Sequence, residues 1–155
     1  MDTSMIELKA FSKDFLEKEF GLKLKIDITL NGRLSRAMGR FIAMNRKSHS
    51  IELSKNLVQY NDMEIIKDVL KHELIHYALY EMGLPNGDDD KEFINTCNRL
   101  GAPLTETFSI KQPVHQYKCS CTVRERRRRI KNFNTSKYKC MGCNEILEYI
   151  GFKKV

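Results

Sequence analysis

The alternation of hydrophobic and polar side chains along the first hundred residues predicts three helices and three strands. Apolar residues spaced three or four apart, as on one face of a helix, recur over residues 4–20, 61–82 and 89–100. Apolar residues at every second position, or in short apolar runs, predict strands over residues 22–30, 37–45 and 49–53. The order helix, three strands, helix, helix predicts an α+β domain in which helices pack on a small three-stranded sheet.

Capping and glycine signals add detail to two of these elements. Asn61 followed by Glu64 matches the capping-box pattern at the start of the second helix. Gly83 and Pro85 are typical of residues that follow a helix end. In the second strand, Gly39 predicts a close approach or a bulge, because glycine leaves room where a side chain would stand.

The second helix carries the sequence His72-Glu73-Leu74-Ile75-His76. Residues four apart lie on the same face of a helix, so both imidazoles can bind one zinc ion. Glu73 is the neighbour that can take a proton from a water molecule at such a site. The alternative is two surface histidines beside a solvated glutamate. The apolar surroundings argue against that alternative, because three polar side chains without a partner are costly there.

A catalytic zinc ion takes three protein ligands, so a third ligand is expected outside the helix. The two remaining histidines, His49 and His115, lie in a predicted strand and near a domain boundary. Asp88, Asp89 and Asp90 follow the helix at a turn that can fold back on it, and a carboxylate oxygen also binds zinc. We expect one of these aspartates to be a ligand; the alternative is an acidic cluster that only caps the next helix.

Four cysteines near the C-terminus predict a second zinc site. They are arranged as Cys119-x-Cys121 and Cys140-x-x-Cys143, which resembles the two turns of a zinc ribbon around one structural zinc ion. The first pair is one residue tighter than usual. A ribbon that has lost its metal and a hairpin with free cysteines are the alternatives. The fifth cysteine, Cys97, has the apolar position of a core residue.

The net charge of +7 is concentrated in one segment. Residues 118–139 hold nine Lys or Arg and one acidic residue, so this segment alone carries +8. Aromatic residues lie among these cations, and the combination is typical of contact with nucleic-acid phosphates and bases. A charged edge strand that prevents aggregation is the alternative. The predicted nucleic-acid-binding residues are Arg124, Arg126, Arg127, Arg128, Arg129 and Lys131.

The composition also bears on the cellular compartment and on the number of domains. No apolar run approaches the 18 residues of a membrane span, and the first ten residues lack the pattern of a secretory signal. We therefore expect a cytoplasmic protein without a membrane partner, in which cysteines bind metal rather than form disulfides. Two domains are expected, over residues 1–112 and 113–155.

Four features together resemble the bacterial SprT-like proteins, which are relatives of the Spartan-type DNA-dependent proteases. They are the motif H-E-L-I-H-Y, the segment D-K-E-F that begins at Asp90, the strand G-R-F-I that begins at Gly39, and the four-cysteine ribbon. The resemblance implies a zincin-like metalloprotease domain followed by a zinc ribbon. It implies zinc ligation by His72 and His76 and an acid–base role for Glu73. Relatives carry a third histidine where this chain has Asp88, or Asp89 if the turn is shorter.

The leading hypothesis is therefore a zinc metalloprotease that associates with DNA and acts on DNA-bound proteins. It requires one catalytic and one structural zinc ion, a nucleic acid partner and a protein substrate. A second hypothesis is a nucleic-acid-binding or regulatory protein whose metal centre is structural or vestigial, which the aspartate in place of histidine favours. A third is an unrelated zinc hydrolase of small substrates, which leaves the basic ribbon unexplained.

Overall fold

The computed structural model describes residues 3–34, 37–104, 114–121, 123–126, 140, 142–145 and 148–153. The chain divides into two compact units, Met1–Ile110 (unit 1) and Lys111–Val155 (unit 2), and each is described here by itself. The boundary predicted between residues 112 and 113 lies outside the described residues. None of the described helices is long and apolar enough to cross a membrane.

Unit 1 contains four helices and three strands among its described residues. In chain order they are α1 (Thr3–Phe20), β1 (Asp27–Asn31), β2 (Gly39–Met44), β3 (Lys47–Ser54), α2 (Lys55–Tyr60), α3 (Met63–Glu81) and α4 (Lys91–Leu100). This confirms the predicted α+β class with a small three-stranded sheet. Helix α2 was not predicted, because six residues are too few for the helical period to show. Its first turn is capped by Ser54, whose hydroxyl accepts a hydrogen bond from the Leu57 amide.

The sheet of unit 1 has the order β1-β3-β2, with β1 parallel and β2 antiparallel to β3. Strand β3 is central, and its Ile51 and Leu53 are fully buried. Strands β2 and β3 form a hairpin whose turn residues, Asn45 and Arg46, both have positive φ angles, 53° and 61°. A two-residue turn of this kind matches the right-handed twist of the paired strands. Because β3 is the central strand, β2 lies at one edge of the sheet.

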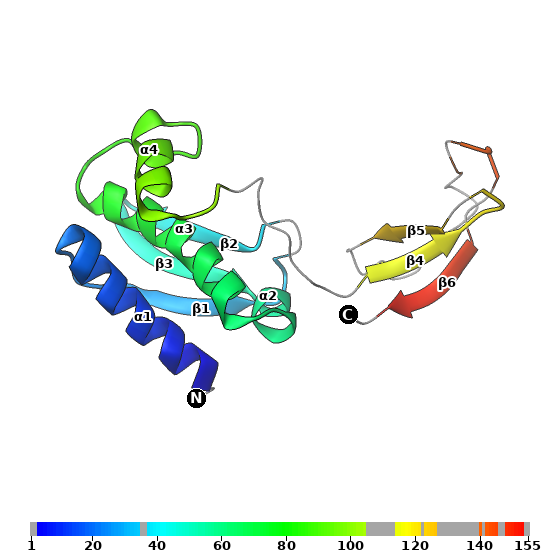
Figure 1. Ribbon diagram of the computed structural model, residues 1–155, viewed down its shortest axis with the longest axis horizontal. Coiled ribbons are helices and arrows are strands. Elements are labelled where there is room, and N and C mark those ends of the chain that lie inside the picture. Colours follow the sequence, from blue (N-terminus) through cyan, green and yellow to red (C-terminus); the bar gives the residue numbers. More distant parts are fainter. Residues whose placement is uncertain are drawn as a thin grey trace. The chain divides into compact units, whose positions relative to one another are not determined.

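Helices α1 and α3 lie across one face of this sheet, as Figure 1 shows. Between them and the strands lies the hydrophobic core, which takes Leu8 and Leu16 from α1 and Leu70 and Leu74 from α3, all fully buried. Burying each such side chain stabilises the fold by about 1.5–3 kcal/mol. The stretch of α3 that carries the histidine motif is thus fixed against the sheet through its apolar face.

The first strand is shorter than predicted, since it begins at Asp27 rather than at residue 22. The reason is Tyr77 of α3, a fully buried residue whose hydroxyl donates a hydrogen bond to the Lys23 carbonyl oxygen (3.0 Å) and accepts one from the Lys25 amide (3.2 Å). These bonds satisfy the backbone of residues 23–25 without a strand partner. The segment therefore keeps its alternating apolar contacts with the core but does not join the sheet.

The predicted capping box at the start of α3 is wrong. The N-cap residue is Asp62, and it makes no side-chain capping bond. The Asn61 side chain instead turns back and donates to the Leu57 carbonyl oxygen at 3.1 Å, so it closes the end of α2. Asn61, which the sequence pattern assigned to the start of α3, thus caps the end of α2. The other end is as predicted: α3 stops at Glu81, and Gly83 follows with a φ of +69°.

Unit 2 is a three-stranded antiparallel sheet among its described residues. Its strands are β4 (Val114–Lys118), β5 (Val123–Arg126) and β6 (Glu148–Lys153), in the order β5-β4-β6. Cys119 and Cys121 lie in the connection from β4 to β5, while Cys140 and Cys143 precede β6. The two cysteine pairs are therefore carried by two separate turns.

We expect Tyr77→Phe to destabilise unit 1 by about 1–3 kcal/mol, because it removes the partner of two backbone groups without changing the apolar volume. The measurement is the free energy of unfolding in urea. Tyr80→Phe is the matched control, since Tyr80 lies on the same helix and its hydroxyl makes no hydrogen bond within the described part of the chain. Equal losses in the two variants would contradict the anchoring role of Tyr77.

Candidate functional site

Helix α3 places the imidazoles of His72 and His76 side by side. The two residues are one turn apart, and their Nε2 atoms lie 3.2 Å from each other. His72 is buried, with 3% of its side chain exposed, and His76 is only slightly more exposed, at 12%. The same-face arrangement predicted from the spacing of the motif is therefore present.

The loop after α3 brings a carboxylate to the same point. Oδ1 of Asp88 lies 3.2 Å from Nε2 of His72 and 3.1 Å from Nε2 of His76. Asp88 is the aspartate that completes a group of three possible ligands with the histidines. Asp90 has a different role, because its Oδ2 accepts a hydrogen bond from the Gly87 amide (2.7 Å) and shapes the loop. His49 lies in β3, where its Nδ1 is 2.9 Å from the Ser50 hydroxyl.

The outer nitrogens of both imidazoles contact backbone carbonyl oxygens. Nδ1 of His72 lies 2.9 Å from the Pro103 oxygen, and Nδ1 of His76 lies 2.5 Å from the Asn86 oxygen. A carbonyl oxygen can only accept, so each Nδ1 carries the proton, and in the neutral rings each Nε2 presents a lone pair. Three acceptor atoms therefore converge with no proton among them, which is the donor set of a cation site.

The distances also suit the geometry of zinc. Nitrogen and oxygen ligands at about 2.0–2.1 Å in a tetrahedral arrangement are about 3.3–3.4 Å apart. The three separations here are 3.1, 3.2 and 3.2 Å. His72, His76 and Asp88 thus suit three corners of a zinc tetrahedron, and they are the three members of this group among the described His, Cys, Asp and Glu residues. Catalytic zinc sites have three protein ligands, whereas structural sites have four.

Phe93 of α4 fixes the orientation of both histidine rings. Its ring stacks on that of His76, with centroids 4.0 Å apart and planes at 10°, and meets the edge of His72 at 4.9 Å. Phe93 is fully buried, so its position is set by the core. The sequence predicted Phe93 only as an apolar residue of its helix, because ring-on-ring contact between two helices leaves no sequence signal.

The side chain of Glu73 in α3 lies against β2, in the space left by Gly39. A Cβ atom at Gly39 would lie 3.0 Å from Cγ of Glu73, which is tighter than most real Cβ contacts. The predicted close approach at Gly39 is therefore confirmed, and its partner is Glu73. The Glu73 carboxylate accepts a hydrogen bond from the Phe41 amide of the same strand. A buried carboxyl group is thus held at the edge strand beside the candidate metal ligands.

Burial controls the ionisation of this group and of its neighbour. Desolvation, with a further contribution from the negative charge of Asp88, raises the pKa of Glu73 to about 8, although the Phe41 amide opposes the shift. Desolvation likewise lowers the pKa of His76, against the opposing effect of its bond to the Asn86 carbonyl. Burial therefore favours the neutral imidazole, which is the form that binds a metal.

The four cysteines of unit 2 form a second candidate metal site. Their Sγ atoms all lie within 4.8 Å of one another, including 3.3 Å between Cys119 and Cys121 and 3.4 Å between Cys121 and Cys140. These separations are far longer than a disulfide bond of about 2.05 Å. Four thiols around one point are compatible with a structural zinc ion, as the ribbon pattern predicts. Cys97 is buried in α4, in agreement with its predicted core position.

Glu145 ties the two cysteine turns together. Its carboxylate accepts hydrogen bonds from the Ser120 amide (3.0 Å) and from the Ser120 hydroxyl. Ser120 is the single residue between Cys119 and Cys121, so the bond holds the tight turn directly. These bonds lower the pKa of Glu145, which keeps the carboxylate ionised. No local pattern predicts this contact, because Ser120 and Glu145 are far apart along the chain.

The predicted nucleic-acid-binding residues are only partly within the described structure. Arg124 and Arg126 belong to β5, in register with Tyr117 and His115 of β4. Arg127, Arg128, Arg129 and Lys131 lie outside the described residues. Their proposed contact with nucleic acid stays a prediction.

Comparison with known proteins gives a consistent result. The family model described as the SprT-like family matches residues 7–131. A protein named "Protein SprT-like" from Staphylococcus epidermidis (strain ATCC 35984) is 31% identical over 152 residues, which cover 96% of this chain and 98% of the relative. Proteins with the same name from Geobacillus sp. (strain WCH70) and Staphylococcus carnosus (strain TM300) are 32% and 31% identical over 139 and 144 residues. These matches cover 85% and 89% of this chain, and 84% and 91% of the relatives.

The raised pKa of Glu73 predicts a pH-dependent cost in protein prepared without metal. Its pKa in the unfolded chain is near 4.5, so between pH 4.5 and about 8 the folded state binds more protons than the unfolded state. Stability from this group is complete below pH 4.5 and is lost as pH rises toward 8. We therefore expect metal-free Glu73→Gln to become more stable than metal-free wild type as pH rises from 5 to 8, measured by urea unfolding. A pH-independent difference would contradict the burial of an ionisable Glu73.

The contact of Glu145 with Ser120 predicts that Glu145→Gln weakens metal binding by unit 2. Loss of a residue that orients a metal ligand typically costs about 10–100-fold in affinity. Competition with a chromophoric zinc chelator measures this loss. Glu148→Gln is the control, since Glu148 is an exposed carboxylate of the same unit. The idea fails if both variants bind zinc as tightly as wild type.

Proposed function

The chain belongs to the SprT-like family, and we propose that it is a zinc-dependent metalloprotease, zincin-like in its catalytic unit, that acts on DNA-bound proteins. One observation carries the proposal. Two imidazole nitrogens and the Asp88 carboxylate converge on one point, and the buried Glu73 carboxyl group lies beside them at an edge strand. This combination supplies a three-ligand site and an acid–base group, which are the two requirements of metal-assisted peptide hydrolysis.

The division of labour follows from the positions of these side chains. His72, His76 and Asp88 would hold the zinc ion, with Pro103 and Asn86 fixing the two imidazoles through their Nδ1 protons. When bound, zinc supplies a Lewis acid that lowers the pKa of a water molecule toward ~7 and polarises a carbonyl oxygen. Glu73 would accept the proton of that water on a carboxylate oxygen and pass it to the nitrogen of the leaving amine. The Phe41 amide holds the carboxylate in place for both transfers.

Strand β2 offers a place for an extended peptide. The Met38 carbonyl accepts a hydrogen bond from the Ser54 amide, so this residue faces β3. Because successive residues of a strand face opposite sides, the backbone groups of Gly39 and Phe41 face the open edge. A substrate that adds to this edge as a further strand would bring its backbone next to Glu73. The open edge therefore supports a peptide, rather than a small molecule, as the substrate.

The association with DNA rests on unit 2 and on the family resemblance. The segment of residues 118–139 carries a net charge of +8, which exceeds what solubility requires. A ribbon with this charge would hold the enzyme on the nucleic acid and bring bound proteins within reach. Proteins bound to DNA are the proposed substrates, because unit 2 would hold the enzyme near them and the edge of β2 would accept an extended peptide.

The rival function is a nucleic-acid-binding or regulatory protein with a structural or vestigial metal centre. The observation that favours it is the third ligand, because Asp88 stands where the resemblance implies histidine and its side chain is 64% exposed. The rival predicts that no zinc remains once the cysteine site is removed. Zinc content after Cys119→Ser and Cys121→Ser separates the two functions, since the protease keeps one zinc ion per chain at the helix site.

We expect Glu73→Gln to keep its zinc and to lower cleavage of a DNA-bound protein by at least about 10²-fold, the usual contribution of a general base. The assay compares the same protein substrate free and bound to single-stranded DNA, alongside metal content by mass spectrometry. Glu64→Gln is the matched control, because Glu64 is an exposed carboxylate in the first turn of the same helix. Full activity in Glu73→Gln would refute the assignment of Glu73. Equal cleavage of free and DNA-bound substrate would contradict the proposed association with DNA.

A further inference from the structure

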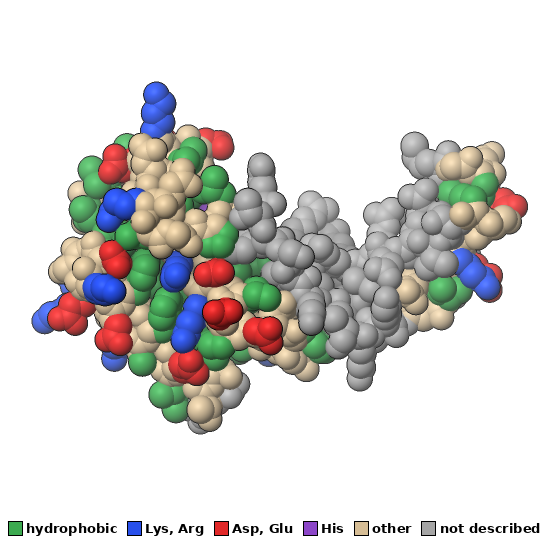
Figure 2. Space-filling view, in the orientation of Figure 1, with side chains coloured by type: hydrophobic (Ala, Val, Ile, Leu, Met, Phe, Trp, Pro, Cys, Tyr) green, Lys and Arg blue, Asp and Glu red, His purple; other side chains and the backbone are tan. Residues whose placement is uncertain are grey.

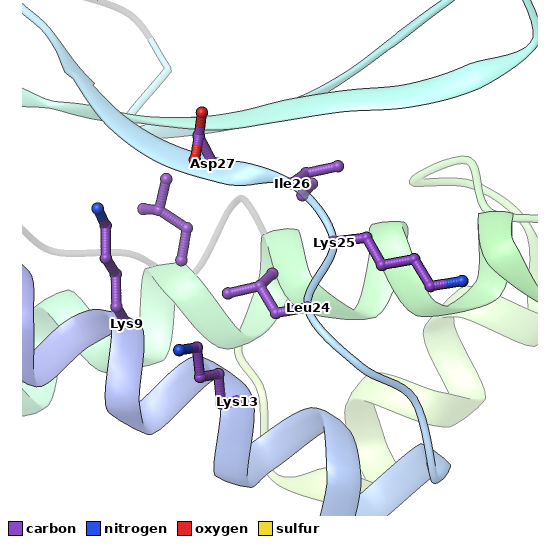
Figure 3. A pocket seen from close by; sticks show the side chains of 7 residues that line it. Lys9, Lys13, Leu24, Lys25, Ile26 and Asp27 are labelled. Atoms are coloured by element: carbon purple, nitrogen blue, oxygen red, sulfur yellow. The ribbon is translucent and has the colours of Figure 1, made fainter.

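A pocket of about 330 Å³ lies between α1 and the segment that leads into β1. We call it the lysine pocket; its lining residues are Lys9, Lys13, Leu24, Lys25, Ile26, Asp27 and Ile28. Figure 3 shows α1 on one side of the pocket and the segment of residues 24–27 on the other. The pocket has no residue in common with the candidate metal site, so the proposed protease does not account for it.

Two lysine side chains of α1 line the pocket. Lys9 and Lys13 are four residues apart on the helix, so they lie one above the other on the same face. In Figure 3 both side chains rise from α1 toward the space in front of the opposite wall, while Lys25 extends away from it. Asp27 is the single carboxylate of the lining. None of these four residues forms an ion pair with another described residue, and the three lysines of the lining outnumber its one carboxylate.

The rest of the lining is aliphatic and firmly held. Leu24, Ile26 and Ile28 contribute apolar surface, and Ile28 is only 2% exposed. The hydroxyl of Tyr77 holds this wall through its bonds to the Lys23 carbonyl and the Lys25 amide. The opposite wall, α1, is anchored by the fully buried Leu8 and Leu16. A pocket between two anchored walls is preformed, which lowers the cost of binding a ligand.

The positive charge is local to the pocket. Residues 1–110 hold 15 Lys or Arg against 17 Asp or Glu, so unit 1 as a whole has a slight acidic excess. On the face shown in Figure 2, acidic and basic side chains of unit 1 are interspersed. Three lysines with one aspartate around a hollow therefore depart from the rest of the unit. Nonspecific attraction of anions by a basic surface does not explain this arrangement.

We propose that the lysine pocket binds the phosphate group of a nucleotide, with Nζ of Lys9 and Nζ of Lys13 contacting the phosphate oxygens. The aliphatic wall would pack against the sugar. Lysine is a point charge suited to phosphate, and the terminal phosphate of a free nucleotide, with a charge of about −1.5 to −2, can neutralise both ammonium groups. The nucleotide is either free or part of a nucleic acid strand, since both present phosphate oxygens and a sugar. This inference goes beyond the proposed protease and requires neither zinc nor cleavage.

The experiment follows the backbone amide signals of residues 24–28 in the full-length, zinc-loaded protein by NMR. The probes are inorganic phosphate, thymidine monophosphate and a single-stranded thymidine oligonucleotide. We expect titratable shifts with the two nucleotide probes, with a dissociation constant of about 1 mM or tighter, the range of a ligand held by a few contacts. In Lys9→Gln/Lys13→Gln the affinity should fall at least about tenfold. Lys9→Arg/Lys13→Arg should restore it, because the charge returns.

The matched control is Lys18→Gln/Lys47→Gln, which removes the same charge from two exposed lysines outside the pocket and should leave the shifts unchanged. Saturation by thymidine monophosphate supports a free nucleotide as ligand, and shifts with the oligonucleotide alone support a strand. For a strand, the double variant should lower the salt dependence of binding by about 0.7 in log–log slope, since the two lysines contact one phosphate and each neutralised phosphate contributes about 0.7.

The proposal is overturned if no probe shifts residues 24–28, or if the double glutamine variant binds like the wild type. Tighter binding of a tetraglutamate peptide than of the nucleotides would also overturn it, in favour of an acidic protein partner. None of these readouts depends on peptide cleavage. Failure of the lysine pocket is therefore distinguishable from failure of the protease assignment, which rests on Glu73 and on zinc content.

Discussion

The structure of unit 1 depends on one close group of three possible hydrogen-bond acceptors, contributed by His72, His76 and Asp88. Nε2 of His72, Nε2 of His76 and Oδ1 of Asp88 lie 3.1–3.2 Å apart, a distance at which uncompensated acceptors repel one another. Such an arrangement is stable only if a cation or a shared proton occupies the centre. The surrounding residues prevent the rings from turning away: Pro103 and Asn86 hold the Nδ1 protons, and Phe93 packs on both rings. The convergence is thus imposed by the fold.

The same constraint explains why α3 is so firmly held. Its apolar face is buried against the sheet, Tyr77 binds the backbone of residues 23–25, and Glu73 passes over Gly39 to the Phe41 amide. A site in which three ligands must meet within a few tenths of an ångström needs supports that do not shift. Gly39 contributes by the absence of a side chain, because a Cβ there would press on Cγ of Glu73 at 3.0 Å and require a shift of a few tenths of an ångström. Packing and chemistry therefore depend on the same few positions.

The sequence could predict what depends on period and spacing. The three long helices, the three strands, the same-face histidines and the grouping of the cysteines all follow from distances along the chain. What it could not predict depends on contacts between distant residues. Helix α2 takes Asn61 from the predicted capping box, and Tyr77 draws residues 22–26 out of the predicted strand. Pro103, Asn86, Phe93 and Glu145 support the two candidate metal sites through such contacts, and no local pattern marks them.

The identity of the third ligand decides how far the departure from the family pattern matters. Spacing alone left three aspartates open, and the structure brings Asp88 to the histidines while Asp90 shapes the loop. A carboxylate in this position does not by itself argue against catalysis, because two histidines and one carboxylate form the ligand set of some known zinc peptidases. Compared with a neutral third imidazole, the carboxylate adds one negative charge near Glu73. Desolvation is the main cause of the raised pKa of Glu73, and the charge of Asp88 adds to it. Asp88 thus contributes to the electrostatics around Glu73 while it completes a group of three possible metal ligands with the two histidines.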